Sequence, residues 1–194
     1  MNTIPSRPSV PEDTLLDAAA DVFLRYGIAR TTMADIAKAA GVSRQTLYGR
    51  FDNKNGIASA TMAYVMDRAV AQVRADWRGQ QTVGARLDTY FEHLIVHPYR
   101  LVQDSPDADD LLNGSDPRVR PAYKYATELK MAAMHDLLAP HAARCESAGQ
   151  NIDRFARMVA AAAIGLKVSA ESEEDLRALL DSLRTTVLAV LGEN

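Results

Sequence analysis

The sequence predicts an all-α protein. Helix-forming alanine is abundant, with 32 residues in a chain of 194, whereas β-branched Val and Ile number only 14 and 7. Glycine and proline are sparse, at 10 and 8 residues. In most segments, apolar residues recur every three or four positions, which is the spacing of one helix face. We therefore expect about nine helices, with three short ones followed by about six longer ones.

Composition excludes several classes of protein. With 47% apolar residues the chain can bury a sizeable core, and no apolar run approaches the roughly 18 residues that cross a bilayer. The N-terminus lacks the pattern of a signal peptide, and the lone Cys145 cannot pair within the chain, so we expect a cytoplasmic protein. A net charge of −3 disfavours a general polyanion binder but permits a local basic face.

The first helices can be placed from their end signals. Residues 1–10 contain two prolines and no apolar periodicity, so they predict a flexible tail. Residues 11–56 then predict a three-helix unit. Its first helix begins at Pro11 and ends at Gly27, a residue that tolerates left-handed backbone.

Residues 31–50 have the pattern of a helix-turn-helix. Thr32 and Asp35 resemble a capping box at the start of the second helix. Gly41 supplies a turn residue that accepts unusual φ, and Ser43 suits the N-cap of the third helix. This arrangement is typical of DNA-binding units, because the N-terminal end of the third helix enters the major groove.

The predicted third helix exposes side chains that suit DNA. Arginine can make two hydrogen bonds to guanine and glutamine two to adenine, so Arg44 and Gln45 are candidates for reading bases. Tyrosine, arginine and lysine further along suit phosphate oxygens. The candidate DNA-binding residues are Thr32, Ser43, Arg44, Gln45, Thr46, Tyr48, Arg50 and Lys54.

The segment from about Pro11 to Ala60 resembles the TetR family of bacterial transcription regulators. The resemblance is carried by the run Leu15-Leu16-Asp17-Ala18-Ala19, then Phe23, Tyr26-Gly27, Thr31-Thr32-Met33, Asp35-Ile36-Ala37, Ala40-Gly41-Val42-Ser43, Thr46-Leu47-Tyr48, Phe51 and Lys54. It implies a homodimer that binds a palindromic operator, usually as a repressor, with Tyr48 and Lys54 on phosphates. Gln45, Arg50 and Asn55 depart from the family's common glycine, histidine and glutamate.

The resemblance implies that residues 57–194 form a helical effector-binding and dimerisation domain. They carry 15 basic and 19 acidic residues, against 7 and 6 in residues 1–56. The segment 104–117, rich in proline and acids, is the least regular. Beyond a long fourth helix that ends near Gly79, helices are predicted at about 83–97 (with Pro98 ending the helix or beginning a turn), 119–139, 152–169 and 172–191.

Large apolar, aromatic and histidine residues gather in the middle helices. Apolar walls with a few polar groups form small-molecule pockets, so an apolar or aromatic effector is expected once the resemblance is considered. For each residue taken alone, ordinary core packing is the favoured interpretation. The candidate pocket residues are Met62, Met66, Trp77, Tyr90, Phe91, His93, His97, Tyr123, Met131, Met134 and His135.

The last two helices are candidates for the dimer interface. Small residues allow helices to pack closely, and an apolar stripe follows on the final helix, so two such helices from each copy would form a four-helix bundle. Packing within the chain's own core is the alternative. The candidate interface residues are Ala156, Ala160, Ala163, Ile164, Leu176, Leu180, Leu183 and Val187.

No enzyme or metal motif stands out. There is no phosphate-binding glycine loop, no Gly-x-Ser-x-Gly and no zinc-ligand cluster, so we expect neither catalysis nor a cofactor. His93 and His97 have metal-ligand spacing, with Glu92 and His135 as further potential ligands, but ordinary polar helix residues are the preferred reading. A constitutive or activating DNA-binding protein and, more remotely, an all-helical enzyme remain as alternatives.

Overall fold

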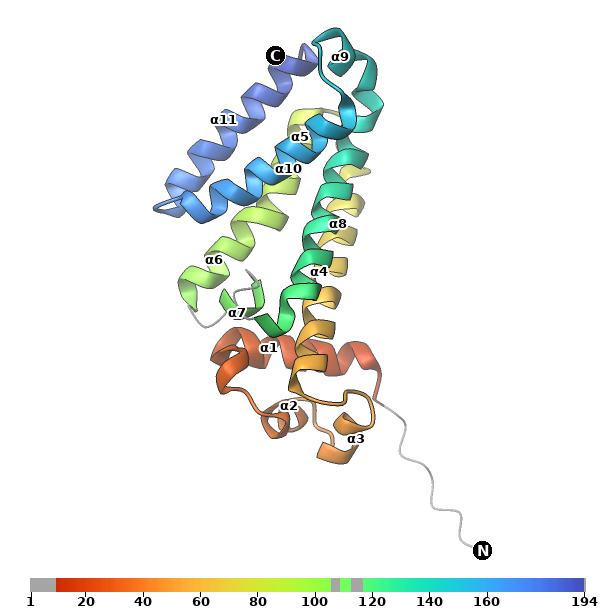
Figure 1. The fold of residues 1–194 in the computed structure, drawn as a ribbon, viewed down its shortest axis with the longest axis vertical. Coiled ribbons are helices and arrows are strands. Elements are labelled where there is room, and N and C mark those ends of the chain that lie inside the picture. Colours follow the sequence, from red (N-terminus) through yellow and green to blue (C-terminus); the bar gives the residue numbers. More distant parts are fainter. Residues whose placement is uncertain (1–9, 106–108, 113–116, 194) are drawn as a thin grey trace, which may run out of the picture.

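The computed structural model describes residues 10–105, 109–112 and 117–193 (Figure 1). Within these ranges the chain forms helices and turns and no strand, which confirms the all-α prediction. The expected tail lies, apart from Val10, outside the described residues, as does part of segment 104–117. The N-terminal unit, called the head below, comprises α1 (Glu12–Arg30), α2 (Met33–Ala39) and α3 (Arg44–Tyr48).

A larger helical unit, called the body below, follows the head. In Figure 1 the head lies at one end of the elongated molecule, and the last two helices lie near the other end. The long helix that leaves the head is α4 (Lys54–Trp77). The remaining elements are α5 (Val83–Phe91), the π-helical segment η1 (Glu92–Val96), α6 (His97–Asp104), α7 (Asp109–Leu112), the 3-10 turn η3 (Pro117–Val119), α8 (Arg120–Leu138), the 3-10 turn η4 (Ala139–His141), α9 (Ala142–Ser147), α10 (Ile152–Ser169) and α11 (Glu173–Leu191).

Pro98 does not end the helix that begins at Val83. The backbone passes from α5 through η1 into α6, and the N–H of His97 bonds to the carbonyl of Glu92 in the wider π pattern. Pro98 lies in the first turn of α6, where a residue without an N–H is tolerated. The helical path therefore continues to Asp104, seven residues beyond the predicted end.

Two cores hold the molecule together, and α4 belongs to both. The head core includes Ile57 and Met62 of α4, whereas Val73 and Trp77 of the same helix lie in the body core. Val119 of η3 and Ala122 of α8 also pack in the head core. Residues on both sides of the predicted boundary at residue 56 therefore pack in one core. Because this core is close-packed, a displacement of α4 or α8 in the body also displaces the helices of the head.

Polar contacts reinforce the α4–α8 pairing and join α6 to the head. The guanidinium of Arg74 lies 2.6 Å from the Asp136 carboxylate, and the Tyr125 hydroxyl donates to Asp67 at 2.8 Å. The Ser105 hydroxyl, just after α6, donates to the carbonyl of Leu24 on α1 at 2.8 Å. The head is therefore connected to the body at α4, α8 and the end of α6.

Candidate nucleic-acid interface and effector cavity

The start of α2 is closed by a capping box. The Thr32 hydroxyl accepts the N–H of Asp35 at 3.3 Å, and the Asp35 carboxylate accepts the backbone N–H of Thr32 at 2.9 Å and its hydroxyl at 2.6 Å. These hydrogen bonds from Thr32 lower the pKa of Asp35, which keeps the carboxylate ionised. The expected capping box is confirmed.

The turn and the third helix follow from local chemistry. Gly41 has φ +66°, a left-handed conformation that side-chain-bearing residues rarely adopt. The Ser43 hydroxyl accepts the N–H of Thr46 at 3.0 Å and so caps α3. Leu47, fully buried, anchors the inner side of α3 and leaves the opposite side exposed. The helix is therefore held at a fixed angle with its N-terminal turn in solvent.

The structure brings the eight predicted DNA-binding residues to this end of the head, but some of their side chains are already hydrogen-bonded or ion-paired and others are not. Arg44, Gln45 and Tyr48 are exposed on α3, and their side chains form no hydrogen bond with another described residue. The Ser43 and Thr46 hydroxyls bond to each other at 2.9 Å, in addition to the cap. Three groups thus project freely, and the hydroxyls beside them serve the fold.

Arg50 and Lys54 already have partners. The Arg50 guanidinium lies 3.5 Å from the Glu12 carboxylate, and the Lys54 ammonium donates to the carbonyl of Ala29 at 3.0 Å. Lys54 thereby joins the first turn of α4 to the end of α1. The backbone N–H groups of Asn55 and Gly56 in this first turn donate to the side-chain oxygen of Asn53, which caps α4. Exposed pairs of this kind are weak, because water competes for both partners.

The capped α2, the glycine turn and the exposed α3 form a helix-turn-helix, and α3 carries arginine and glutamine at its exposed N-terminal end. This arrangement defines a helix-turn-helix DNA-binding protein. Residues 15–61 match the family described as "Bacterial regulatory proteins, tetR family". The transcriptional activator FasR of Mycolicibacterium smegmatis is 30% identical over 161 residues, which cover 79% of this chain and 67% of FasR. The chain belongs to the TetR family and is a DNA-binding transcriptional regulator.

Other relatives agree on class and fold. The transcriptional repressor ComR of Escherichia coli is 34% identical over 87 residues, but the match spans only 41% of ComR and 44% of this chain. The structure of FadR from Bacillus subtilis, in complex with stearoyl-CoA, superposes with a TM-score of 0.63 at 19% identity, covering 95% of this chain and all of FadR. These relatives are regulators of transcription and not enzymes.

The predicted effector-pocket residues do not form one site. Met62, Met66 and Tyr123 line a single cavity between α4, α7 and α8, whereas Phe91 lines a different groove. Met131 and Tyr123 contribute to a shallow surface hollow on α8. The other six are core or surface residues: Trp77, Tyr90 and Met134 are buried in the body core, and His93, His97 and His135 lie at the surface. Only three of the predicted residues therefore share the α4–α7–α8 cavity, and an effector site there stays a prediction.

Specific hydrogen bonds explain why two of the aromatic residues belong to the core. The Trp77 indole donates to the carbonyl of Arg86 at 2.9 Å, and the Tyr90 hydroxyl donates to the carbonyl of Lys130 at 3.0 Å. His93 and His135 instead lie 3.3 Å and 3.1 Å from aspartates. Each of these polar groups has a partner where it lies, and none of the four side chains lines the α4–α7–α8 cavity.

The α4–α7–α8 cavity contains a residue that sequence analysis missed. It has a volume of about 20 Å³ and is lined by Met62, Val65, Met66, Leu112, Tyr123, Ala126 and Lys130. Lys130 is only 3% exposed. Its spacing of four from both Ala126 and Met134 places it on the buried stripe of α8, a signal that the sequence does contain.

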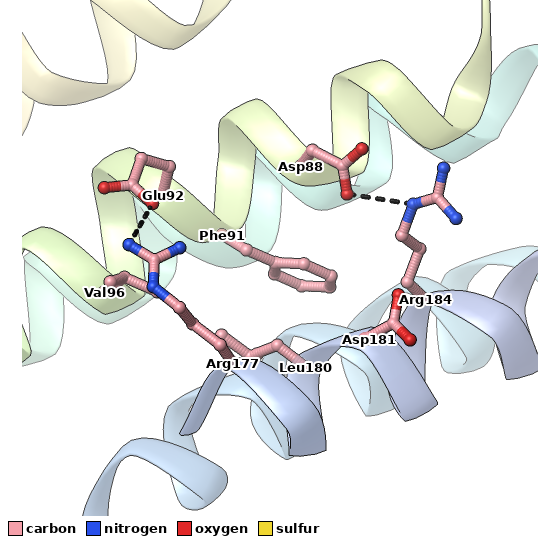
Figure 2. A pocket seen from close by; sticks show the side chains of 8 residues that line it. All are labelled: Asp88, Phe91, Glu92, Val96, Arg177, Leu180, Asp181 and Arg184. Carbon is pink, nitrogen blue, oxygen red and sulfur yellow. Dashed lines mark ion pairs between the residues drawn. The ribbon is translucent and has the colours of Figure 1, made fainter. Parts of the chain in front are cut away.

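A second hollow lies between α5, η1 and α11. Phe91 points from α5 toward Leu180 on α11, and an ion pair lies on either side of it: Glu92 with Arg177 at 2.9 Å and Asp88 with Arg184 at 2.9 Å (Figure 2). The groove measures about 340 Å³. Four of its charged residues form these two ion pairs between α5–η1 and α11, so this groove mainly joins α5 to α11.

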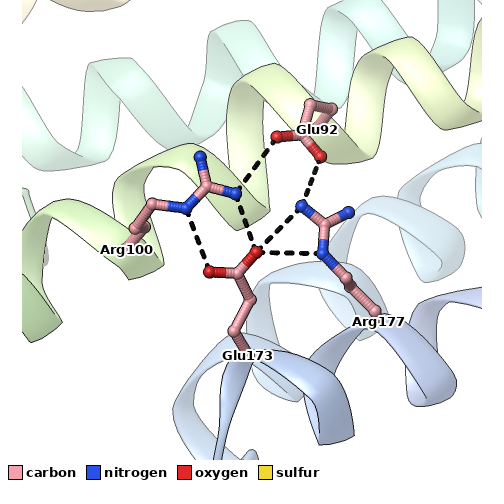
Figure 3. A network of polar contacts seen from close by, with 4 residues as sticks. All are labelled: Glu92, Arg100, Glu173 and Arg177. Carbon is pink, nitrogen blue, oxygen red and sulfur yellow. Dashed lines mark hydrogen bonds and ion pairs between the residues drawn. The ribbon is translucent and has the colours of Figure 1, made fainter.

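The same surface extends into a network of four charged residues (Figure 3). Arg100 of α6 makes two hydrogen bonds to Glu173, at 3.0 and 2.7 Å, and Arg177 lies 2.9 Å from both Glu173 and Glu92. Hydrogen bonds from Arg100 and then Arg177 lower the pKa of Glu173 to about 2. The network fixes the N-terminal end of α11 against η1 and α6.

Most of the predicted dimer-interface residues lie in the core of the single chain. Ile164 and Leu183 are half-buried against that core, and the other six are at most 3% exposed: Ala156, Ala160, Ala163, Leu176, Leu180 and Val187. Periodicity located the apolar stripes correctly but not the element that covers them. Within the chain these stripes pack against each other, α5 and α8, as the alternative interpretation expects, and the position of a dimer interface stays a prediction.

No group of three or more His, Cys, Asp or Glu side chains among the described residues could hold a metal ion. Over the same residues, no helix is both long and apolar enough to cross a membrane.

Proposed function

We propose that this regulator is a cytoplasmic homodimer that represses transcription from a palindromic operator and is released by a small apolar or aromatic effector. The observation that carries this proposal is the exposed N-terminal turn of α3, with Arg44 and Gln45 free of partners among the described residues. Two such helices must lie about 34–36 Å apart to enter successive major grooves, which requires two copies of the chain.

In this proposal the head residues divide into two groups. Arg44 and Gln45 read base edges, and Tyr48, about half exposed, reaches a phosphate oxygen. Arg50 and Lys54 exchange their partners Glu12 and the Ala29 carbonyl for phosphates at little cost, since exposed pairs contribute about 0–1 kcal/mol. Thr32, Ser43 and Thr46 hold the backbone that presents these groups, and their exposed hydroxyls supply further hydrogen bonds to DNA.

We assign the dimer contact to the outer face of α10. Met158 and Val168 are the most exposed large apolar side chains of the helix, at 53% and 78%. Exposed Ala161 and Gly165 lie between them at three- and four-residue spacing. A stripe of this kind suits a close helix–helix contact with a second copy. Sedimentation at micromolar concentration should show a dimer, and Ala161→Glu should yield monomers while Ala143→Glu on α9 does not.

The effector is proposed to enter the α4–α7–α8 cavity. Met62, Val65 and Met66 of α4 line it, and Met62 also packs in the head core. A ligand that separates α4 from α8 would therefore tilt α4 and change the distance between the two heads of a dimer. Such a ligand must bind the DNA-free state better, or the equilibrium does not shift. The stearoyl-CoA complex of FadR, which shares this fold, supports control by an apolar ligand.

A gel-shift titration tests the proposal. Duplexes from upstream of the protein's own gene should be shifted at low salt, with an affinity that falls steeply as salt increases. Arg44→Ala should abolish the preference for one fragment, whereas Arg78→Ala, at an exposed position just after α4, should not. Failure to shift any upstream fragment at low salt would refute operator binding. If the protein increased transcription from the bound promoter instead of decreasing it, it would be an activator, which is how its relative FasR is described.

A further inference from the structure

Lys130 is a buried lysine in a cavity whose other walls are mainly apolar. Its side chain extends from α8 into the space lined by methionine, valine and leucine of α4 and α7, and it is 3% exposed. Its backbone carbonyl accepts the hydroxyl of Tyr90, but its ammonium has no hydrogen bond or ion pair with any described residue. A lysine in this position would normally be paired or replaced by a nonpolar residue, because burying an unpaired charge is costly.

A second buried lysine increases that cost. Lys167 of α10 is 5% exposed and close enough to Lys130 to act on it electrostatically. Burial, followed by the charge of Lys167, lowers the pKa of Lys130 to about 7. Asp109 of α7 acts on Lys167, and no carboxylate among the described residues offsets the charge of Lys130. The interior between α4, α8 and α10 therefore has a positive potential that nothing described neutralises at Lys130.

We propose that the effector of this cavity is an amphiphilic anion, an apolar body bearing one carboxylate, and that the Lys130 ammonium donates to the carboxylate. This inference rests on the proposed function, since it names the ligand class of the same cavity. The hydrocarbon part packs against Met62, Val65 and Met66, and the phenol of Tyr123 lines the same space.

The residues that line the cavity disfavour two other classes of ligand. A neutral apolar ligand would fill the space but leave Lys130 unpaired. A small hydrophilic anion would pair with Lys130 but leave the methionine and valine walls without an apolar partner. Because the cavity measures only about 20 Å³, the apolar body must separate α4 from α8 as it enters. Binding is thereby coupled to the helix that continues into the head.

Calorimetry with a matched pair of probes tests the proposal. Decanoate and 1-decanol have the same chain length and differ in the charge of the head group. The wild-type protein should bind decanoate at least about tenfold more tightly than 1-decanol, as expected for one charge-assisted hydrogen bond. Lys130→Met should remove this preference by weakening decanoate binding and leaving 1-decanol unchanged. Lys124→Met, on the same helix but with a side chain that is 78% exposed, is the matched control and should bind as wild type.

Three results would overturn the inference: no binding of decanoate to the wild type, equal affinity for the two probes, or full decanoate affinity in Lys130→Met. If that variant does not fold, the affinities of the wild-type protein for decanoate and 1-decanol still test the inference. Titration of wild-type protein labelled at the lysine Cε positions should then show decanoate perturbing the Lys130 signal. Gel shifts of the ligand-free protein test operator binding separately, so decanoate binding without operator binding would refute only the regulatory proposal.

Discussion

The Asp17 carboxylate of α1 lies 2.8 Å from the Arg68 guanidinium of α4 and also accepts the hydroxyl of Tyr64 at 3.0 Å. The Arg68 guanidinium further donates to the Tyr64 hydroxyl at 2.8 Å. In this cluster, Tyr64 itself packs against the head core, and Arg68 extends the contact between the head and α4 by one further turn. Both members of the Asp17–Arg68 pair are more than half exposed, so the cluster sets the orientation of the helices more than their stability.

Asp17→Asn should therefore have a small effect on stability and a larger one on coupling. We expect the free energy of unfolding to fall by no more than about 1 kcal/mol, as measured by urea denaturation. Release of operator DNA by effector should weaken, because a tilt of α4 is no longer transmitted fully to α1. Asp21→Asn, also exposed on α1, is the control for removal of a charge. A loss of several kcal/mol would show that the pair is structural.

Thr32→Ala should destabilise the head. It removes the hydroxyl that accepts the Asp35 N–H and donates to the Asp35 carboxylate, whose other partner, the backbone N–H of residue 32, remains; loss of such a helix cap costs about 1 kcal/mol. Thr32→Ser keeps the hydroxyl and should restore most of that stability. Thermal unfolding of both variants checks this, and identical midpoints for the two would contradict the role of the cap.

Arg44→Ala and Lys54→Ala should weaken DNA binding in different ways. Loss of a phosphate contact at Lys54 should lower affinity for operator and random duplexes alike and reduce the salt slope by about one unit. Loss of a base contact at Arg44 should reduce discrimination by about 1–3 kcal/mol per base pair. Gel shifts on operator and scrambled DNA over a range of salt measure both. Wild-type preference and salt slope in both variants would refute the assignment.

Glu173 should contribute to the acid sensitivity of the fold. Its folded-state pKa lies near 2, below the ordinary value of 4.5, because Arg100 and Arg177 stabilise its ionised form. The unfolded chain therefore binds more protons between these values, and the contribution of Glu173 to stability, complete above pH 4.5, is lost as pH falls toward 2. The stability difference between wild type and Glu173→Gln should narrow over this range in urea titrations. A difference independent of pH would exclude this origin.

Lys130→Met should stabilise the ligand-free protein near neutral pH. The folded-state pKa of Lys130 is lowered from 10.5 to about 7, so the unfolded chain binds more protons between these values. Stability of the wild type should accordingly rise with pH across that window, and this rise should be absent in the variant. The gain from Lys130→Met is thus largest below about pH 7 and declines toward pH 10.5. Urea denaturation at several pH values measures the gain, with Lys124→Met as the control that should show none.

The head was predictable from sequence because its determinants are local. The Thr32–Asp35 box, the turn at Gly41 and the cap at Ser43 each depend on residues three positions apart or on one backbone angle. The limits of α10, Ile152–Ser169, were likewise visible in the apolar period and its flanking residues. In each case the hydrogen bonds and backbone angles that determine the helix end involve residues within one or two helical turns of each other.

The use made of each helix face was decided only in the tertiary structure. Periodicity shows that Ala160 and Leu180 lie on apolar stripes, but it does not distinguish a partner helix of the same chain from one of a second copy. The burial of Lys130 and the π segment that carries the helix past Pro98 likewise depend on neighbours distant in sequence. Local hydrogen bonds determine where a helix begins and ends, whereas long-range apolar packing determines what it buries, and the proposed effector site follows from that packing.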